Sequence, residues 1–193
     1  NIRRSGVSYA AGGSIYQQED SLYRPSLVGN WHPERWQTHF HEEYFKYLDS
    51  DPLFWGIFVG NMFDYGAAGR TCGEGNGIND YGLVTFDRKY CKDAYYFYKA
   101  NWNTTDRFVR IGESRWIIRR KRKQDIRVYS NCEEVELFVN GVSHGWKSPQ
   151  TGIVIWPAVD MQEGTNILEV RSGDQKDTAV IEILNSNSRS VII

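Results

Sequence analysis

The chain has 193 residues, which is enough for one large domain or two modest ones. Hydrophobic residues make up 40% of it and charged residues 24%, as in an ordinary globular protein. A formal net charge of −1 gives no general field that would attract nucleic acid or an acidic membrane. No apolar run approaches the ~18 residues that a membrane-spanning helix needs. We therefore expect neither nucleic acid nor a membrane as a partner.

Residues 32–52 are predicted to form a helix. Pro33 stands near its start, and Asp51-Pro52 ends it. Aromatic residues recur at spacings of four, four and three and therefore share one helical face; they are Trp36, Phe40, Tyr44 and Tyr47.

A nearly continuous apolar run, residues 53–65, follows the helix and predicts a strand that is buried on both sides. The next stretch, residues 66–82, is rich in glycine and too long for a simple structural turn. Residues 88–102 are predicted to form a second helix. Strands that alternate with long loops and helices are typical of a parallel α/β fold.

The pattern changes after Trp102 to short β-branched segments separated by turn residues. Asn140-Gly141 is the strongest hairpin signal in the chain, since both residues tolerate the positive φ of a type I′ turn. We expect strands at residues 114–120, 125–130, 134–141, 152–159, 165–173 and 177–185. This spacing favours an antiparallel sandwich of the immunoglobulin type. The sequence thus predicts an α/β domain at 1–103 and an all-β domain at 104–193.

A metal site or a disulfide framework is not indicated. The three cysteines, Cys72, Cys91 and Cys132, lie far apart and form no CxxC pair or Cys/His cluster. His39 and His41 occur in HFHEE, which is not the HExxH pattern, and the two side chains fall on different faces of a helix. We expect both histidines to be structural and the chain to bind no metal.

Two further features admit both a functional and a structural interpretation. Seven Trp and twelve Tyr suit either sugar stacking or a heavy core. Trp146 and Trp156, in the predicted sandwich, could form a sugar platform or fill the space between the sheets. The basic run RRKRK, Arg119 to Lys123, resembles a nucleic-acid patch, but its place between two predicted strands favours a solvated turn.

Four long segments resemble the C-terminal part of family-two glycoside hydrolases, the β-galactosidase group. They are HPERWQTHFHEEYFKYL (32–48), WGIFVGNMFDY (55–65), GINDYGLVTFDRKYCKDAYYFYKANW (77–102) and VYSNCEEVELFVNG (128–141). The resemblance implies α/β plus all-β architecture: the last two βα units of a (β/α)8 (TIM) barrel, followed by an immunoglobulin-like β-sandwich. The implied reaction is retaining hydrolysis of β-glycosides, with carbohydrate as the partner and no cofactor.

The stretch GVSYAAGGS, residues 6–14, lacks the acid that this resemblance implies. Family members carry a phrase such as GVSEYGAGGS at the end of the seventh barrel strand, and its Glu is the nucleophile. Aligned from the right, Ser8 occupies the place of that Glu; aligned from the left, the Glu is absent between Ser8 and Tyr9. A retaining glycosidase needs two carboxyl groups ~5–5.5 Å apart, and a serine hydroxyl is a weak nucleophile without a base. We therefore expect the chain to be inactive.

The resemblance also suggests a substrate site. Family members usually carry Trp in the phrase FVWN of the eighth strand, whereas this chain has FVGN, and Gly60 offers no stacking surface. Asn61 and Asp64 lie where that strand ends, and this end of a barrel faces the active site. For Asp64, contact with the ligand and bracing of the loop both stay open. Tyr9 adjoins the missing acid and either lines the site or packs in the core.

The triplet Asn79-Asp80-Tyr81 bears on the sugar. Family-two β-glucuronidases carry Asn-x-Lys here, and the Lys binds the sugar carboxylate. Without that ammonium group a uronic acid has no evident counter-ion, so the resemblance implies a neutral sugar such as galactose, with Asn79 at the site.

The resemblance covers only the last quarter of the barrel, and two βα units cannot close it. The acid/base Glu of the family lies upstream of these residues. We expect the chain alone to hydrolyse no glycoside and to need the upstream barrel portion of the same protein, or association between copies as a homo-oligomer. The rival interpretation is a non-catalytic carbohydrate-binding or interaction module in which the sandwich binds the ligand.

Overall fold

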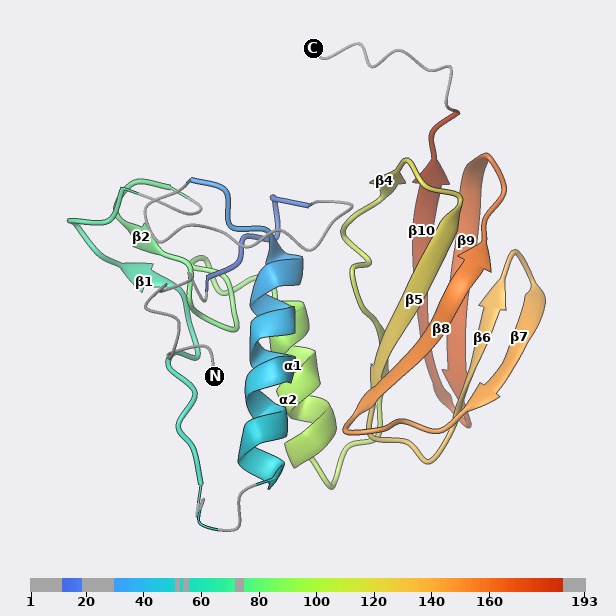
Figure 1. Ribbon diagram of the computed structural model, residues 1–193, viewed down its shortest axis with the longest axis horizontal. Helices are drawn as coiled ribbons and strands as arrows, with labels where there is room; N and C mark the ends of the chain where they lie inside the picture. The colour runs from blue at the N-terminus through green and yellow to red at the C-terminus, as the bar shows by residue number, and fades with distance from the viewer. Residues whose placement is uncertain (1–11, 19–29, 51–52, 54–55, 72–74, 186–193) are drawn as a thin grey trace. The chain divides into compact units, whose positions relative to one another are not determined.

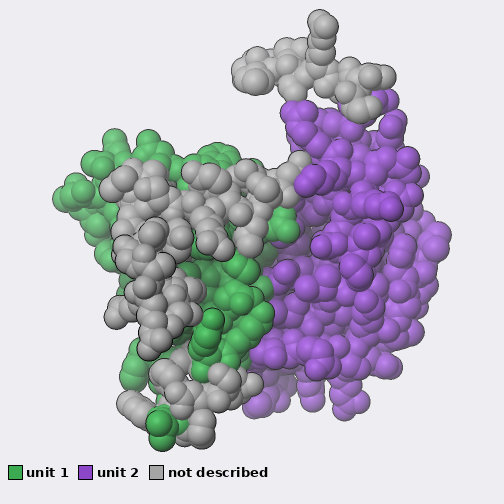
Figure 2. All heavy atoms as spheres, viewed as in Figure 1, with its two compact units in different colours: residues 1–95 green, residues 96–193 purple. Residues whose placement is uncertain are grey.

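The computed structural model describes residues 12–18, 30–50, 53, 56–71 and 75–185. The chain divides into two compact units, residues 1–95 and residues 96–193, which Figure 2 colours separately. Within the described ranges, no helix is long and apolar enough to cross a membrane.

The first predicted helix is confirmed as α1 (Glu34–Ser50). Glu34 places an acid in the first turn, where it complements the positive end of the helix dipole. Trp36 is buried, whereas Tyr44 is exposed, although its ring stacks on that of Phe40 with the centroids 6.2 Å apart. The predicted aromatic face is therefore buried at its N-terminal end and exposed further along.

The second predicted helix is confirmed as α2 (Asp93–Trp102). The backbone N–H of Asp93 donates a hydrogen bond of 2.8 Å to Glu34 Oε1. This bond satisfies one of the amide groups that a helix leaves unpaired at its start. Further along α2, within the second unit, the ring of Phe97 meets that of Tyr129 edge-on, with 6.4 Å between centroids.

The buried strand predicted at 53–65 is wrong for most of the part that the structure describes. Residues 56–60 belong to no strand, and Phe58 is 93% exposed. The end of the run does pair: the carbonyls of Asn61 and Met62 accept hydrogen bonds from the amides of Leu83 and Val84. A strand buried on both faces needs a neighbour on each side, and no described residue supplies one for 56–60.

The glycine-rich stretch contains a short hairpin. β1 (Tyr65–Gly66) pairs antiparallel with β2 (Ile78–Asn79). Phe63 also forms an isolated parallel bridge with Val84. This segment therefore carries its own backbone pairing and holds residues 79–82 beside the end of the 53–65 run.

The described residues of the second unit form eight strands in two sheets (Figure 1). One sheet has the order β4-β10-β9-β6-β7, and the other has the order β3-β5-β8. All neighbours are antiparallel except β4 and β10, which run parallel. The strands are β3 (Val109–Ile111), β4 (Ile118–Arg119), β5 (Lys123–Ser130), β6 (Val135–Val139), β7 (Val142–Lys147), β8 (Ile153–Asp160), β9 (Gly164–Ser172) and β10 (Gln175–Ile183).

The six segments predicted as strands all contain strands, and the hairpin at Asn140-Gly141 is confirmed between β6 and β7. Its two central residues have φ of 51° and 81°, the positive values that a type I′ turn requires. The three residues of β3 were not predicted, because a run this short has no readable alternation.

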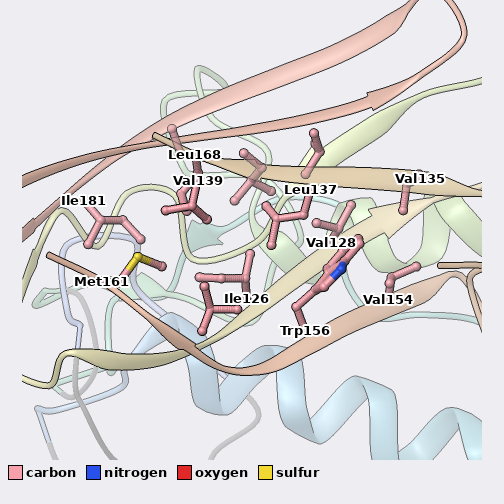
Figure 3. Close-up of a cluster of buried hydrophobic side chains, with 14 of the residues drawn as sticks. Ile126, Val128, Val135, Leu137, Val139, Val154, Trp156, Met161, Leu168 and Ile181 are labelled. Carbon is pink, nitrogen blue, oxygen red and sulfur yellow. The ribbon is translucent and has the colours of Figure 1, made fainter. Parts of the chain in front are cut away.

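The core of this unit lies between the two sheets (Figure 3). Alternate residues of β6 point into it, so that Val135, Leu137 and Val139 are buried while Glu136 and Phe138 are only partly covered. Full burial of such a side chain contributes ~1.5–3 kcal/mol. Cys132 packs against this core.

Candidate functional site

Five charged or titratable side chains meet inside the first unit. We call this group the Asp64 cluster; it consists of His32, Asp64, Arg70, Asp80 and Lys92. Lys92 Nζ lies 2.9 Å from Asp64 Oδ1, and His32 Nδ1 lies 2.8 Å from Asp80 Oδ2. The guanidinium of Arg70 approaches Asp80 Oδ1 at 3.7 Å. Each carboxylate in the cluster therefore has a basic group beside it.

The cluster fastens the loop at residues 80–82 to the end of the 53–65 run. Asp64 Oδ1 accepts a 2.8 Å hydrogen bond from the amide of Gly82, and Lys92 Nζ donates one of 3.0 Å to the carbonyl of Asp80. Gly82 must lack a side chain, because a Cβ there would lie 2.0 Å from the amide nitrogen of Asp64. Gly12 is similar, since its Cβ would lie 2.1 Å from Asp80 Oδ1. Close backbone approach thus explains two of the glycines.

Four members of the cluster cannot touch a ligand in this arrangement. The side chains of His32, Asp64, Asp80 and Lys92 are fully buried, and that of Arg70 is mostly covered. Burial of charges is tolerated only when they are paired and hydrogen-bonded. The contacts of Asp64 therefore indicate a structural role: its buried carboxylate positions the loop at residues 80–82.

His41 lies on α1 and is buried. Removal from water and, to a smaller extent, the positive charge of Lys92 together lower the pKa of its imidazole to about 4. The ring is therefore neutral at pH 7. Among the described residues, no group of three or more His, Cys, Asp or Glu side chains is arranged to hold a metal ion.

The other predicted site residues lie at different depths. Gly60 and Asn61 are exposed, and a Cβ added to Gly60 would meet no atom within 4 Å. Asn79 is buried; its Nδ2 donates to Tyr65 Oη at 3.0 Å, and its Oδ1 accepts from the amide of Tyr81 at 3.0 Å. The structure therefore brings the predicted residues on 60–64 and 79 into one loop region.

Ser8 and Tyr9 lie outside the described residues, so the turn that lacks the acid has no structural account. The residues that sequence reasoning missed are His32, Arg70 and Lys92. Lys and Arg are rarely buried unless they are paired. The residues next to them in the sequence do not show whether the fold supplies such a partner, so a buried Lys or Arg cannot be recognised from its local sequence. Gly12 and Gly82 are the sequence features that indicate close packing here, because the backbone at these glycines lies close to Asp80 and Asp64.

Comparisons with known proteins find that β-glucuronidases and β-galactosidases match most of this chain. A β-glucuronidase from Bacteroides fragilis is 50% identical over 175 residues, which are 90% of this chain and 25% of that protein. β-Galactosidase BoGH2A from Bacteroides ovatus is 33% identical over 129 residues, or 66% of this chain and 15% of that protein. The crystal structure of a putative β-galactosidase from Bacteroides fragilis superposes with a TM-score of 0.82 at 28% identity, covering 91% of this chain and 27% of that chain.

The chain is similar, along most of its length, to enzymes of glycoside hydrolase family two. A sequence family described as a domain of unknown function, DUF4982, also matches residues 121–180, which lie in the sandwich. The resemblance to the family-two enzymes is thereby confirmed. The chain spans about a quarter or less of the length of these curated relatives.

Proposed function

We propose that this chain is the C-terminal part of a retaining glycoside hydrolase that acts on neutral β-glycosides such as β-galactosides. In this proposal residues 1–103 end a (β/α)8 barrel and residues 104–193 form an immunoglobulin-like sandwich. The observation that carries the class of reaction is the 50% identity over 90% of the chain to a β-glucuronidase. A β-galactosidase among the relatives agrees with the same class of reaction.

The chain alone is inactive in this proposal. GVSYAAGGS holds no carboxylate where the family nucleophile belongs, whether Ser8 replaces the Glu or the Glu is deleted before Tyr9. Attack on the anomeric carbon and protonation of the leaving oxygen each need a carboxyl group. The second carboxyl group of the family lies upstream of this chain.

The substrate-contacting residues that we propose lie at the surface end of the loop region. Gly60 and Asn61 are exposed there, and Asn79 holds the tyrosine ring of Tyr65 through its amide. Tyr9 would line the site beside the missing acid. Asp64 acts beneath these residues by holding the 80–82 loop through Gly82.

A neutral sugar is favoured by the side chain at position 81. Tyr81 stands where family β-glucuronidases have Lys, and its ring lies under the guanidinium of Arg70, 4.6 Å from the centroid. A phenol offers no positive charge to a sugar carboxylate. The Bacteroides fragilis relative is named a β-glucuronidase, so both sugars belong in the assay.

The partner in this proposal is the upstream barrel portion of the same protein, and no cofactor takes part. Large apolar side chains of the first unit are exposed in a way that suits burial by further barrel strands; they include Tyr44, Tyr47, Phe58, Met62 and Phe63. A second copy of the chain would cover the same residues if the chain formed a homo-oligomer. Gel filtration of the purified chain separates these two arrangements.

The first test assays the purified chain with aryl β-galactoside and aryl β-glucuronide. We expect no release of the aryl alcohol from either, and measurable turnover would overturn the proposed inactivity. The chain is then joined to the upstream three quarters of the Bacteroides fragilis relative, with that relative's own last quarter as the positive control. We expect the hybrid to be inactive with Ser8 and active after Ser8→Glu or after insertion of Glu between Ser8 and Tyr9.

The active hybrid then tests the substrate. We expect it to prefer the galactoside and to move towards the glucuronide after Tyr81→Lys. A hybrid that prefers the glucuronide with Tyr81 in place would overturn the neutral substrate. Gly60→Trp should lower KM by restoring a stacking surface in open space. Failure of both Glu variants, while the positive control is active, would leave the non-catalytic module as the function.

A further inference from the structure

A pocket of about 440 Å³ opens at one end of the second unit. Three segments far apart in the sequence build it: the connection from β5 to β6, the turn from β9 to β10, and the residue Arg107 ahead of β3. Trp146, near the end of β7, completes the wall. Loops at the end of a β-sandwich are a common place for ligand binding because the sheets hold them rigidly.

Trp146 offers an open aromatic face to this pocket. It is 51% exposed, and it pairs with Glu136 across β6 and β7, on the side away from the buried Val135 and Leu137. Trp156 differs: it is 3% exposed, its indole Nε1–H donates to the carbonyl of His144, and it points into the core in Figure 3. Of the two tryptophans weighed as sugar platforms, Trp146 is therefore the one that a ligand can reach.

The residues that line the pocket with Trp146 include both hydrogen-bond acceptors and donors. Glu133, Glu134 and Asp174 supply carboxylates, while Arg107 and Gln175 supply N–H donors. The guanidinium of Arg107 is held in place by a hydrogen bond to the carbonyl of Asn131. Hydrogen-bond acceptors and donors beside an apolar face match a pyranose ring, which has C–H groups on one face and hydroxyls at its edge.

The charges of the lining residues limit the classes of ligand that the pocket can bind. The residues that line the pocket include three acids and one arginine, so a phosphate, a uronic acid or a nucleic acid would meet net repulsion. A cation would be attracted by the carboxylates and the indole, but it would leave Arg107 without a role and would be repelled by it. A neutral saccharide uses all of these groups.

We propose that this pocket is a second carbohydrate site, which binds a neutral saccharide through stacking on Trp146 and hydrogen bonds to the Glu133–Glu134 and Arg107 side chains. The site lies wholly within the sandwich unit and does not depend on the missing nucleophile at Ser8. It would hold a polysaccharide or a longer oligosaccharide to the protein whether or not the chain takes part in hydrolysis. Its failure would therefore leave the proposed glycosidase lineage untouched.

The test is titration of the purified chain, labelled with ¹⁵N, with methyl β-galactoside, a β-galacto-oligosaccharide, glucuronate and tri-lysine, followed through the indole N–H signals. We expect the two neutral saccharides to shift the Trp146 signal with a Kd of the order of 1 mM, a typical value for a small, shallow site. Trp146→Ala should weaken binding about tenfold or more, since such anchors dominate small interfaces. Glu134→Gln should weaken it by a smaller factor.

Trp102→Ala is the matched control, because Trp102 is also 51% exposed and lies in the same unit but outside the pocket. We expect it to leave saccharide binding unchanged, and thermal melting should show that all three variants fold. Absence of any shift with the neutral saccharides up to saturating concentrations would overturn the proposal. Equal weakening by Trp102→Ala would overturn it too. A response to tri-lysine or glucuronate in place of the neutral sugars would assign the pocket to another ligand.

Discussion

Lys92 and Asp64 form an ion pair of 2.9 Å in which neither side chain has any exposed surface. The same ammonium group also donates to the carbonyl of Asp80, and the same carboxylate accepts from the amide of Gly82. These charge-assisted hydrogen bonds add to the backbone hydrogen bonds that already join the two segments, such as those from the amides of Leu83 and Val84. Loss of either partner would leave the other as a buried charge, which is the most costly outcome for such a pair.

We expect Lys92→Met to destabilise the first unit by about 3–5 kcal/mol, because the carboxylate of Asp64 would stay buried without its ammonium group. The double variant Lys92→Met with Asp64→Asn should recover part of that loss. Urea unfolding followed by tryptophan fluorescence measures both. Lys89→Met is the control, since the pair of Lys89 with Asp87 is exposed and should contribute little. Equal midpoints for Lys92→Met and the unsubstituted chain would contradict the structural role of this pair.

The stability of the first unit should fall as the pH drops from 6.5 towards 4. The pKa of His41 in the folded chain is about 4, mainly because of burial, against 6.5 for an exposed histidine. Between these values the unfolded chain takes up a proton that the folded chain does not, so unfolding becomes easier, by up to ~3 kcal/mol across the window.

His41→Gln should flatten this dependence, and the exposed His144 provides the control through His144→Gln. Unfolding free energies measured at half-unit steps of pH give the slopes. A slope unchanged by His41→Gln would mean that another group is responsible.

Substitution of Gly152 and of Gly141 can distinguish the energetic cost of backbone strain from that of a steric clash. Both have positive φ, 71° and 81°, but a Cβ on Gly152 would lie 2.7 Å from the Cβ of Ala100, whereas one on Gly141 would meet nothing within 4 Å. We expect Gly141→Ala to cost about 1–2 kcal/mol from strain alone. Gly152→Ala should cost a further ~1–3 kcal/mol, because the end of α2 must move away. Thermal unfolding of the two variants gives the difference, and equal losses would contradict the close approach.

Local patterns predicted the elements whose partners lie near in the sequence. The Asn140-Gly141 turn and its flanking strands required only two residues that tolerate positive φ between β-branched runs. The apolar run 53–65 failed as a strand prediction because strand formation depends on neighbours, and residues 56–60 have none among the described residues. A periodic pattern states which residues can be buried, not what will bury them.

The Asp64 cluster shows the same limit for a site. Asp64 was identified from the motif that ends the 53–65 run, but its partner Lys92 stands 28 positions further along, just before α2. Nothing in the sequence distinguishes a buried lysine from an exposed one such as Lys89. The pocket at Trp146 likewise draws on three separate connections, and their meeting follows from the order of the strands.

In the basic run from Arg119 to Lys123, Arg119 is buried and the other four residues are exposed. We expect this difference in burial to appear as a difference in stability between variants. Arg119 donates hydrogen bonds to the carbonyls of Trp116 and Glu113 and to Gln124 Oε1, at 3.1, 3.0 and 3.0 Å. We expect Arg119→Met to destabilise the second unit by at least about 2 kcal/mol, since buried acceptors would lose their donor. Arg122→Met is the matched control, because Arg122 pairs with Asp160 in an exposed position and should contribute little. Urea unfolding of the two variants tests this prediction. Equal midpoints would contradict it, because they would mean that the hydrogen bonds of Arg119 stabilise the fold no more than the exposed pair of Arg122.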